Sequence, residues 1–128
     1  MSGDAELLER IRDLVNRDRR YRPEAYDFVR HALDHAARLL DVPGHLTGPQ
    51  LLEGVRDLAI LRYGPMAGPV LEHWGLRSTE DVGEIVFNLI DIGVLSKTES
   101  DAREDFANGF DFADAFRARY PWHDRREG

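Results

Sequence analysis

Apolar residues recur every three or four positions through most of the chain, a spacing that predicts amphipathic helices. The repeat begins after Asp4 and runs to about residue 16, then resumes at Pro23 and continues to residue 40. Proline suits the first turn of a helix, because the amide that it lacks would have no partner there. We therefore expect helices at about residues 5–16 and 23–40, joined by a short polar connector.

Two more helices are expected in the middle of the chain. Thr47 and Gln50 have the spacing of a capping box, in which each side chain binds the backbone amide of the other residue. The apolar repeat that follows predicts a third helix that ends at Gly64. A fourth is expected over residues 66–74, and because Pro69 cannot donate a backbone hydrogen bond, its regular part should begin at that proline.

The clearest apolar stripe belongs to a fifth helix, in which Val, Ile and Leu residues repeat up to Ile90. Ser78 or Thr79 is placed to cap its first turn. Gly93 is expected to end it with a left-handed backbone conformation, which glycine adopts without steric cost.

The chain after Gly93 is ambiguous. Residues 94–98 suit a short strand, residues 99–109 fit a β-hairpin or a short helix equally well, and residues 112–119 suit a last short helix. Four phenylalanines are expected to fold back onto the core: Phe106, Phe110, Phe112 and Phe116. The predicted fold is mainly α, a helical bundle with a winged-helix-like helix-turn-helix and a small β-hairpin or short strand near the C-terminus.

The length of 128 residues predicts a single domain over residues 1–128. Residues 1–20 would form the N-terminal helix and connector, residues 21–119 the core and residues 120–128 a tail. No apolar run approaches the roughly 18–20 residues that a bilayer span requires, and the acidic start does not resemble a signal peptide. We expect a cytoplasmic protein without membrane contact, and the absence of cysteine excludes disulfides and thiol chemistry.

The net charge of −7 is concentrated in one region. Residues 78–115 contain ten acidic residues against Lys97 and Arg103, whereas residues 1–40 contain eight arginines and eight acidic residues. Acidic side chains on the outward side of the fifth helix would repel a phosphate backbone, which makes DNA an unfavourable partner. We expect them instead to form a partner-binding surface, made of Glu80, Asp81, Glu84 and Asp91.

The connector between the first two helices is the one concentrated basic stretch. Arg17, Arg19, Arg20 and Arg22 surround Tyr21, and arginine with an interleaved aromatic residue suits RNA, since guanidinium binds phosphate and rings stack on bases. Charge runs of this kind are more often solvated links, or are paired with acidic residues of the same protein.

Two histidine clusters offer weaker catalytic or metal-binding hypotheses. His73 lies between Glu72 and Trp74, and a histidine can act as a general base. No nucleophile motif accompanies it, so a structural histidine is the better interpretation. His31 and His35 have the four-residue spacing that lets two imidazoles share a metal, yet no third ligand is evident. We therefore expect no metal and no cofactor.

Several short blocks resemble a known family. They are RYRPEAYDFV at 20–29, LLEG at 51–54, YGPMA at 63–67, HWG at 73–75, STED at 78–81, GEIVFNL at 83–89, KTE at 97–99, REDF at 103–106 and FDF at 110–112. Together they resemble the small bacterial family known by its Minf locus-tag label, over about residues 21–116. Gly68-Pro69 departs from the pattern of that family. The resemblance implies no established activity, cofactor or catalytic residue.

The sequence thus favours a cytoplasmic protein-interaction or regulatory module that binds an unidentified protein through its acidic winged-helix-like surface. The alternatives are RNA or nucleoprotein binding through residues 17–22, and a small enzyme or metal protein centred on His73 or on His31 and His35. A homodimer formed through the first helix is a further alternative, because its apolar stripe is large for one small core.

Overall fold

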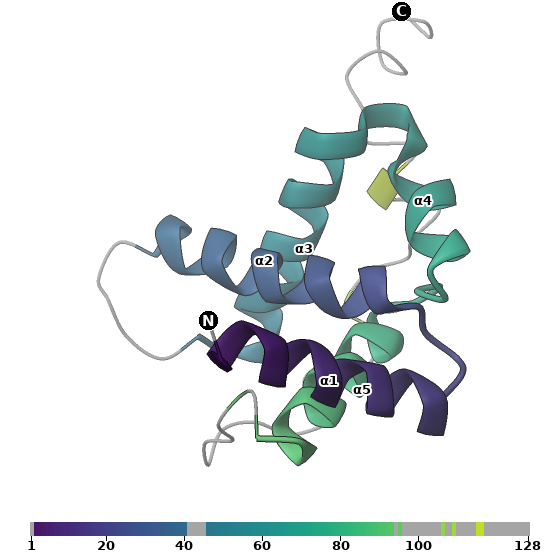
Figure 1. The fold of residues 1–128 in the computed structure, drawn as a ribbon. Coiled ribbons are helices and arrows are strands. Elements are labelled where there is room, and N and C mark those ends of the chain that lie inside the picture. Colours follow the sequence, from purple (N-terminus) through teal and green to yellow (C-terminus); the bar gives the residue numbers. More distant parts are fainter. Residues whose placement is uncertain are drawn as a thin grey trace, which may run out of the picture.

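The computed structural model describes residues 2–40, 46–93, 95, 106, 109, 115 and 116. In that part of the chain the structure is mainly helical and contains no strand (Figure 1). The elements are α1 (Ser2–Arg17), α2 (Pro23–Leu39), α3 (Gly48–Tyr63), the 3₁₀-helix η1 (Gly64–Met66), α4 (Ala67–His73) and α5 (Thr79–Asp91). The mainly α prediction is confirmed. The predicted strand or hairpin and the last short helix fall almost entirely outside the described residues.

Helices α2 and α3 cross at close range and form the centre of the core (Figure 1). The crossing is close because small residues meet there: a Cβ atom added to Gly54 would lie 2.6 Å from the Cβ of Ala36 and 3.0 Å from the carbonyl oxygen of Ala32. Around this point the inward side chains of α2, including Tyr26 and Val29, are fully buried. The amphipathic character predicted for this helix is confirmed at these positions.

Helix α1 lies across the front of the molecule, beside α2 and α5 (Figure 1). Its apolar stripe is only partly buried: Ile11 and Leu14 are in the core, Leu7 and Val15 pack against it, and Leu8 is 60% exposed. The helix begins at Ser2, earlier than the expected start after Asp4.

Three aromatic rings join α2, α3 and the end of α4. The Trp74 ring lies 5.7 Å from the Phe28 ring and 5.8 Å from the Tyr63 ring, the latter pair edge to face. Gly75 follows Trp74 with a φ of 101°, a left-handed conformation that favours glycine and ends α4 as expected. Gly93 likewise has a φ of 83° after α5.

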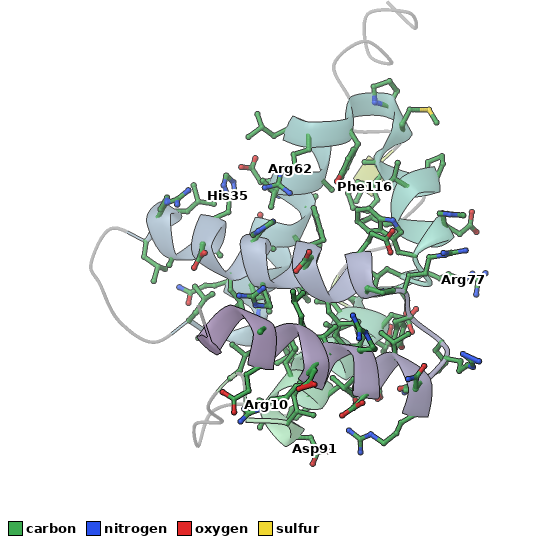
Figure 2. All side chains as sticks on the ribbon, in the orientation of Figure 1. Arg10, His35, Arg62, Arg77, Asp91 and Phe116 are labelled. Atoms are coloured by element: carbon green, nitrogen blue, oxygen red, sulfur yellow. The ribbon has the colours of Figure 1, made fainter. Side chains whose placement is uncertain are left out.

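Two phenylalanines of the C-terminal part pack closely against glycines of α4 and α5. Phe106 and Phe116 are buried, as predicted; Phe110 and Phe112 lie outside the described residues. A Cβ at Gly83 would lie 2.8 Å from the Cβ of Phe106, and one at Gly68 would lie 3.6 Å from the Cβ of Phe116. Figure 2 shows Phe116 between α3 and α4. This part of the sequence therefore completes the core.

Two further helix starts, those of α4 and α5, differ in detail from the predictions. Helix α4 begins at Ala67 and contains Pro69 in its first turn, where the missing amide removes no helical hydrogen bond. The Ser78 side chain makes no capping bond at the start of α5. Asp81, in the first turn, instead accepts at Oδ2 a 2.9 Å hydrogen bond from the amide of Arg77, which lies before the helix. The capping box of α3 is confirmed: Gln50 N donates to Thr47 Oγ1 at 3.2 Å, and Thr47 N donates to Gln50 Oε1 at 2.9 Å.

Candidate interaction surface on α5 and the connector

Helix α5 has an apolar side and an acidic side. Val82, Ile85 and Leu89 are fully buried. Glu80, Glu84 and Asp91 lie on the opposite side, within roughly 40° of one another at the 3.6-residue helical repeat; we call these three residues the acidic stripe. Glu80 and Asp91 are exposed, and Glu84 is partly exposed.

The connector of residues 18–22 lies against α5 and fixes one arginine over this stripe. Arg20 Nε and Nη2 donate to the two Asp18 carboxylate oxygens at 2.9 and 2.7 Å, and Arg20 Nη2 also lies 3.4 Å from Glu84 Oε1. The hydrogen bonds from Arg20 hold the pKa of the Asp18 carboxyl far below its usual range, and the same contact raises the pKa of Arg20. Both groups are therefore charged at neutral pH.

Asn88 of α5 ties the connector to the core. Its Nδ2 donates to Asp18 Oδ2 at 3.2 Å and to the Tyr26 hydroxyl at 3.1 Å. Burial raises the pKa of Tyr26, although the Asn88 contact opposes the shift. This amide satisfies two oxygens from different elements, which fixes the end of α1 relative to α2 and α5.

Asp81 fixes the other end of the connector. The buried Tyr21 hydroxyl donates to Asp81 Oδ1 at 2.7 Å, while Asp81 Oδ2 holds the Arg77 amide. Burial and this hydrogen bond raise the pKa of Tyr21. The amide of Arg22 donates to the Trp74 carbonyl at 3.0 Å. Asp81 thus supports the surface from within and is less available to a partner than the acidic stripe.

At the far end of α5, α1 contributes two further cationic contacts. Arg17 Nη2 lies 3.8 Å from Asp91 Oδ2, and Arg10 Nη1 donates to the Ile92 carbonyl at 3.2 Å. Figure 2 shows Arg10 and Asp91 at this end, and Arg77 at the opposite end beside the connector. Both contacts are exposed to solvent.

The two charged sites predicted from the sequence therefore meet on one face. Arg20 reaches Glu84 and Arg17 reaches Asp91, so two acidic stripe residues are balanced by arginines of the same chain. Glu80, Arg19 and Arg22 are exposed and make no ion pair within the described residues. Because these arginines partly neutralise the stripe, it would repel nucleic acid less than the sequence suggested.

Sequence reasoning did not identify Asp18, Asn88 or Tyr21 as members of this network. Asp18 was visible only as an interruption of an arginine run, and Asn88 only as a polar position in an apolar helix. No periodicity indicates that residues some 70 positions apart will meet.

The histidine clusters are separate from this face. His35 Nε2 donates to Asp57 Oδ2 of α3 at 2.7 Å, and Arg62 Nη1 donates to His31 Nδ1 at 3.4 Å (Figure 2 shows His35 and Arg62). The two imidazoles thus have different partners on α3. Over the described ranges, no three His, Asp or Glu side chains are grouped so as to hold a metal ion.

The sequence favoured a structural histidine at His73. The structure places this residue on the surface, and no described residue forms a hydrogen bond with its side chain. Its position at the end of α4, on the surface, leaves the side chain in solvent while Trp74 turns inward. Neither an acid to orient it nor a nucleophile is brought to it among the described residues.

Comparisons with known proteins found no matching family model, curated protein or solved structure. Among the described helices, none combines the length and the apolar character that crossing a membrane would require.

Proposed function

We propose that this chain is a helical protein-interaction or regulatory module, and that its partner surface is the acidic side of α5. The observation that carries the proposal is the separation of the two sides of this helix. Its apolar residues pack into the core, whereas the acidic stripe faces outward over about three turns of the helix. Glu80, Glu84 and Asp91 would contact the partner, and Asp81 would hold the connector in place beneath them.

The winged-helix-like shape is part of this proposal. Helices α4 and α5, joined by the turn at residues 74–78, have the order of a helix-turn-helix. A wing would come from residues 94–112, which contribute five of the ten acidic residues of the acidic region.

The mixture of charges on this face supports a protein as the partner. A polyanion gains affinity from cations that neutralise its phosphates, and each acidic residue among those cations opposes that gain. On this face Glu80, Glu84 and Asp91 alternate with Arg17 and Arg20. Interspersed charges of both signs are suited to a protein surface with a complementary pattern.

Charge reversal with a matched control tests the proposal. Immobilised wild-type protein is compared with Glu80→Lys/Asp91→Lys and with Glu24→Lys/Glu72→Lys, which reverses two exposed acidic residues on α2 and α4. Proteins retained from the native lysate are identified by mass spectrometry, and circular dichroism confirms folding. We expect the α5 variant to lose partners that the control retains. Equal retention by all three would show that the acidic stripe is not the interface.

The second candidate is RNA binding through the connector. It is favoured by one observation: Arg19 and Arg22 are exposed and make no ion pair within the described residues. A titration with single-stranded RNA at several salt concentrations tests it, with Arg19→Gln/Arg22→Gln compared with Arg12→Gln/Arg38→Gln. Affinity of the wild type should fall as the salt concentration rises, and the connector substitutions should weaken binding more than the control substitutions do. Binding that neither weakens with salt nor depends on Arg19 and Arg22 would exclude this candidate.

Self-association through α1 also stays a proposal. The exposed Leu8 is the position on this helix that a second copy would cover. The mass of the protein in solution, measured for wild type and Leu8→Glu, tests it: a dimer that the substitution dissociates is the expected outcome.

A further inference from the structure

The contacts that hold the N-terminal part of the chain divide into two sets at Asp18. The inner set fixes the connector through Asn88 to Asp18, Tyr21 to Asp81 and the Arg22 amide to the Trp74 carbonyl. The first two are partly buried, and both involve a carboxylate, which makes them strong. These contacts therefore hold the connector firmly against α5 and the end of α4.

The outer set holds α1 itself and is weaker. Among the described residues its polar members are the contact of Arg10 with the Ile92 carbonyl and the ion pair of Arg17 with Asp91. The side chains of that ion pair are 59% and 70% exposed. Exposed ion pairs of this kind contribute little to stability. Among the described residues, the apolar attachment of α1 comes from two buried side chains, Ile11 and Leu14, with Leu7 and Val15 partly buried beside them.

Helix α2, of nearly the same length, buries six residues. Regions with few buried apolar contacts open at lower free energy than the whole protein unfolds. We propose that α1 is a strap that opens as a unit about Asp18, while the connector stays bound to α5, and that the closed strap limits access to the C-terminal end of the acidic stripe. The control of access rests on the function proposed above, whereas the opening does not.

Opening would have a defined consequence for the surface. Arg17 would leave Asp91, Arg10 would leave the Ile92 carbonyl, and the part of the core under Ile11 and Leu14 would become accessible. Arg20 would stay over Glu84, because Asp18 and Asn88 hold it from the connector side. The C-terminal half of α5 would thus change from a balanced to an acidic surface next to newly exposed apolar groups.

Hydrogen exchange of individual amides tests the opening. The strap variant Arg10→Gln/Arg17→Gln is compared with Arg12→Gln/Arg19→Gln, which removes the same charge from exposed arginines that have no ion pair among the described residues. We expect the amides of Ile11 and Leu14 to exchange faster than that of Val29 in the wild type. In the strap variant the amides of Ile11 and Leu14 should exchange up to about tenfold faster than in the wild type, a change equivalent to about 1.4 kcal/mol. The exchange rate of the Val29 amide should be the same in both proteins.

Two results would overturn the opening: equal protection of α1 and α2 amides in the wild type, which indicates a single unfolding unit, or equal acceleration in the strap and control variants. If the double variant does not fold, Arg17→Gln alone against Arg19→Gln gives the same comparison at an exposed pair.

A reversible cross-link tests the control of access. The chain contains no cysteine, so Arg10→Cys/Ile92→Cys can be joined by a reducible thiol cross-linker that holds α1 on α5. Proteins whose retention requires Glu80 and Asp91 should be lost on cross-linking and recovered on reduction. Undiminished retention by the cross-linked protein would show that the strap does not control access. Retention that never depends on Glu80 and Asp91 would refute the proposed function and with it the control of access, and would leave the exchange result standing.

Discussion

The Tyr21 hydroxyl and Asp81 Oδ1 are joined by a 2.7 Å hydrogen bond between the connector and α5. The same carboxylate holds the Arg77 amide, so one acidic side chain of α5 fixes both the connector and the turn before its own helix. Tyr21→Phe removes only the oxygen. We expect the free energy of unfolding to fall by about 1.5–3 kcal/mol, the usual range for a hydrogen bond to a charged group. Urea unfolding measures this change. A loss below about 0.5 kcal/mol would show that a water molecule takes the place of the tyrosine hydroxyl beside Asp81.

High pH should destabilise the protein through Tyr21 and Tyr26. Burial raises the pKa of both in the folded state, so the unfolded chain, with a tyrosine pKa of about 10, loses its protons first. The free energy of unfolding is therefore highest below pH 10 and falls as pH rises above it. Urea unfolding between pH values of about 9 and 11 should show this decline, and Tyr21→Phe should show a smaller one.

Low pH should destabilise the protein through Asp18. Arg20 lowers the pKa of this carboxyl in the folded state, so its contribution is complete above the unfolded value of about 3.9 and is lost as pH falls below it. Asp18→Asn should flatten the acid limb of the stability profile below about pH 4. Asp13→Asn, on the exposed side of α1, is the control and should leave that limb unchanged.

The start of α5 offers a contrast between adjacent residues. Thr79 is 1% exposed; its Oγ1 donates to the Phe106 carbonyl at 2.5 Å and accepts from the Gly109 amide at 3.1 Å. Thr79→Val keeps the shape but leaves two backbone groups unpaired, which should lower the free energy of unfolding by about 2–4 kcal/mol. Ser78→Ala removes no capping bond and should cost about 0.5 kcal/mol or less. Thermal or urea unfolding measures both losses. A larger loss of stability from Ser78→Ala than from Thr79→Val would mean that Ser78 caps the helix.

Gly54 and Gly68 should respond oppositely to alanine. At Gly54 the new methyl would lie 2.6 Å from the Ala36 Cβ, so the α2–α3 crossing must widen, at about 1–3 kcal/mol. At Gly68 the nearest atom is the Phe116 Cβ at 3.6 Å, an ordinary contact, and alanine favours the helix by up to about 1 kcal/mol. Equal effects in urea unfolding would indicate that the crossing is not close-packed.

Local chemistry was sufficient to predict most helix boundaries. Pro23, the Thr47–Gln50 capping box, Gly64 and Gly93 act on the backbone within a few residues of themselves. Each marks the helix start or end that the sequence predicted. The start of α4 was mispredicted because Pro69 is compatible with a first turn as well as with a helix start.

What only the tertiary structure decided is how the charged side chains are partnered. The sequence showed an arginine run and an acidic helix as two separate candidate sites. The fold brings Arg20 to Glu84, Arg17 to Asp91 and Asn88 to Asp18, across 64 to 74 positions of sequence. Helical periodicity determines which side of a helix faces the core. It contains no information about which solvent-facing side chains of different helices will meet, because that depends on the angle and register at which the helices pack.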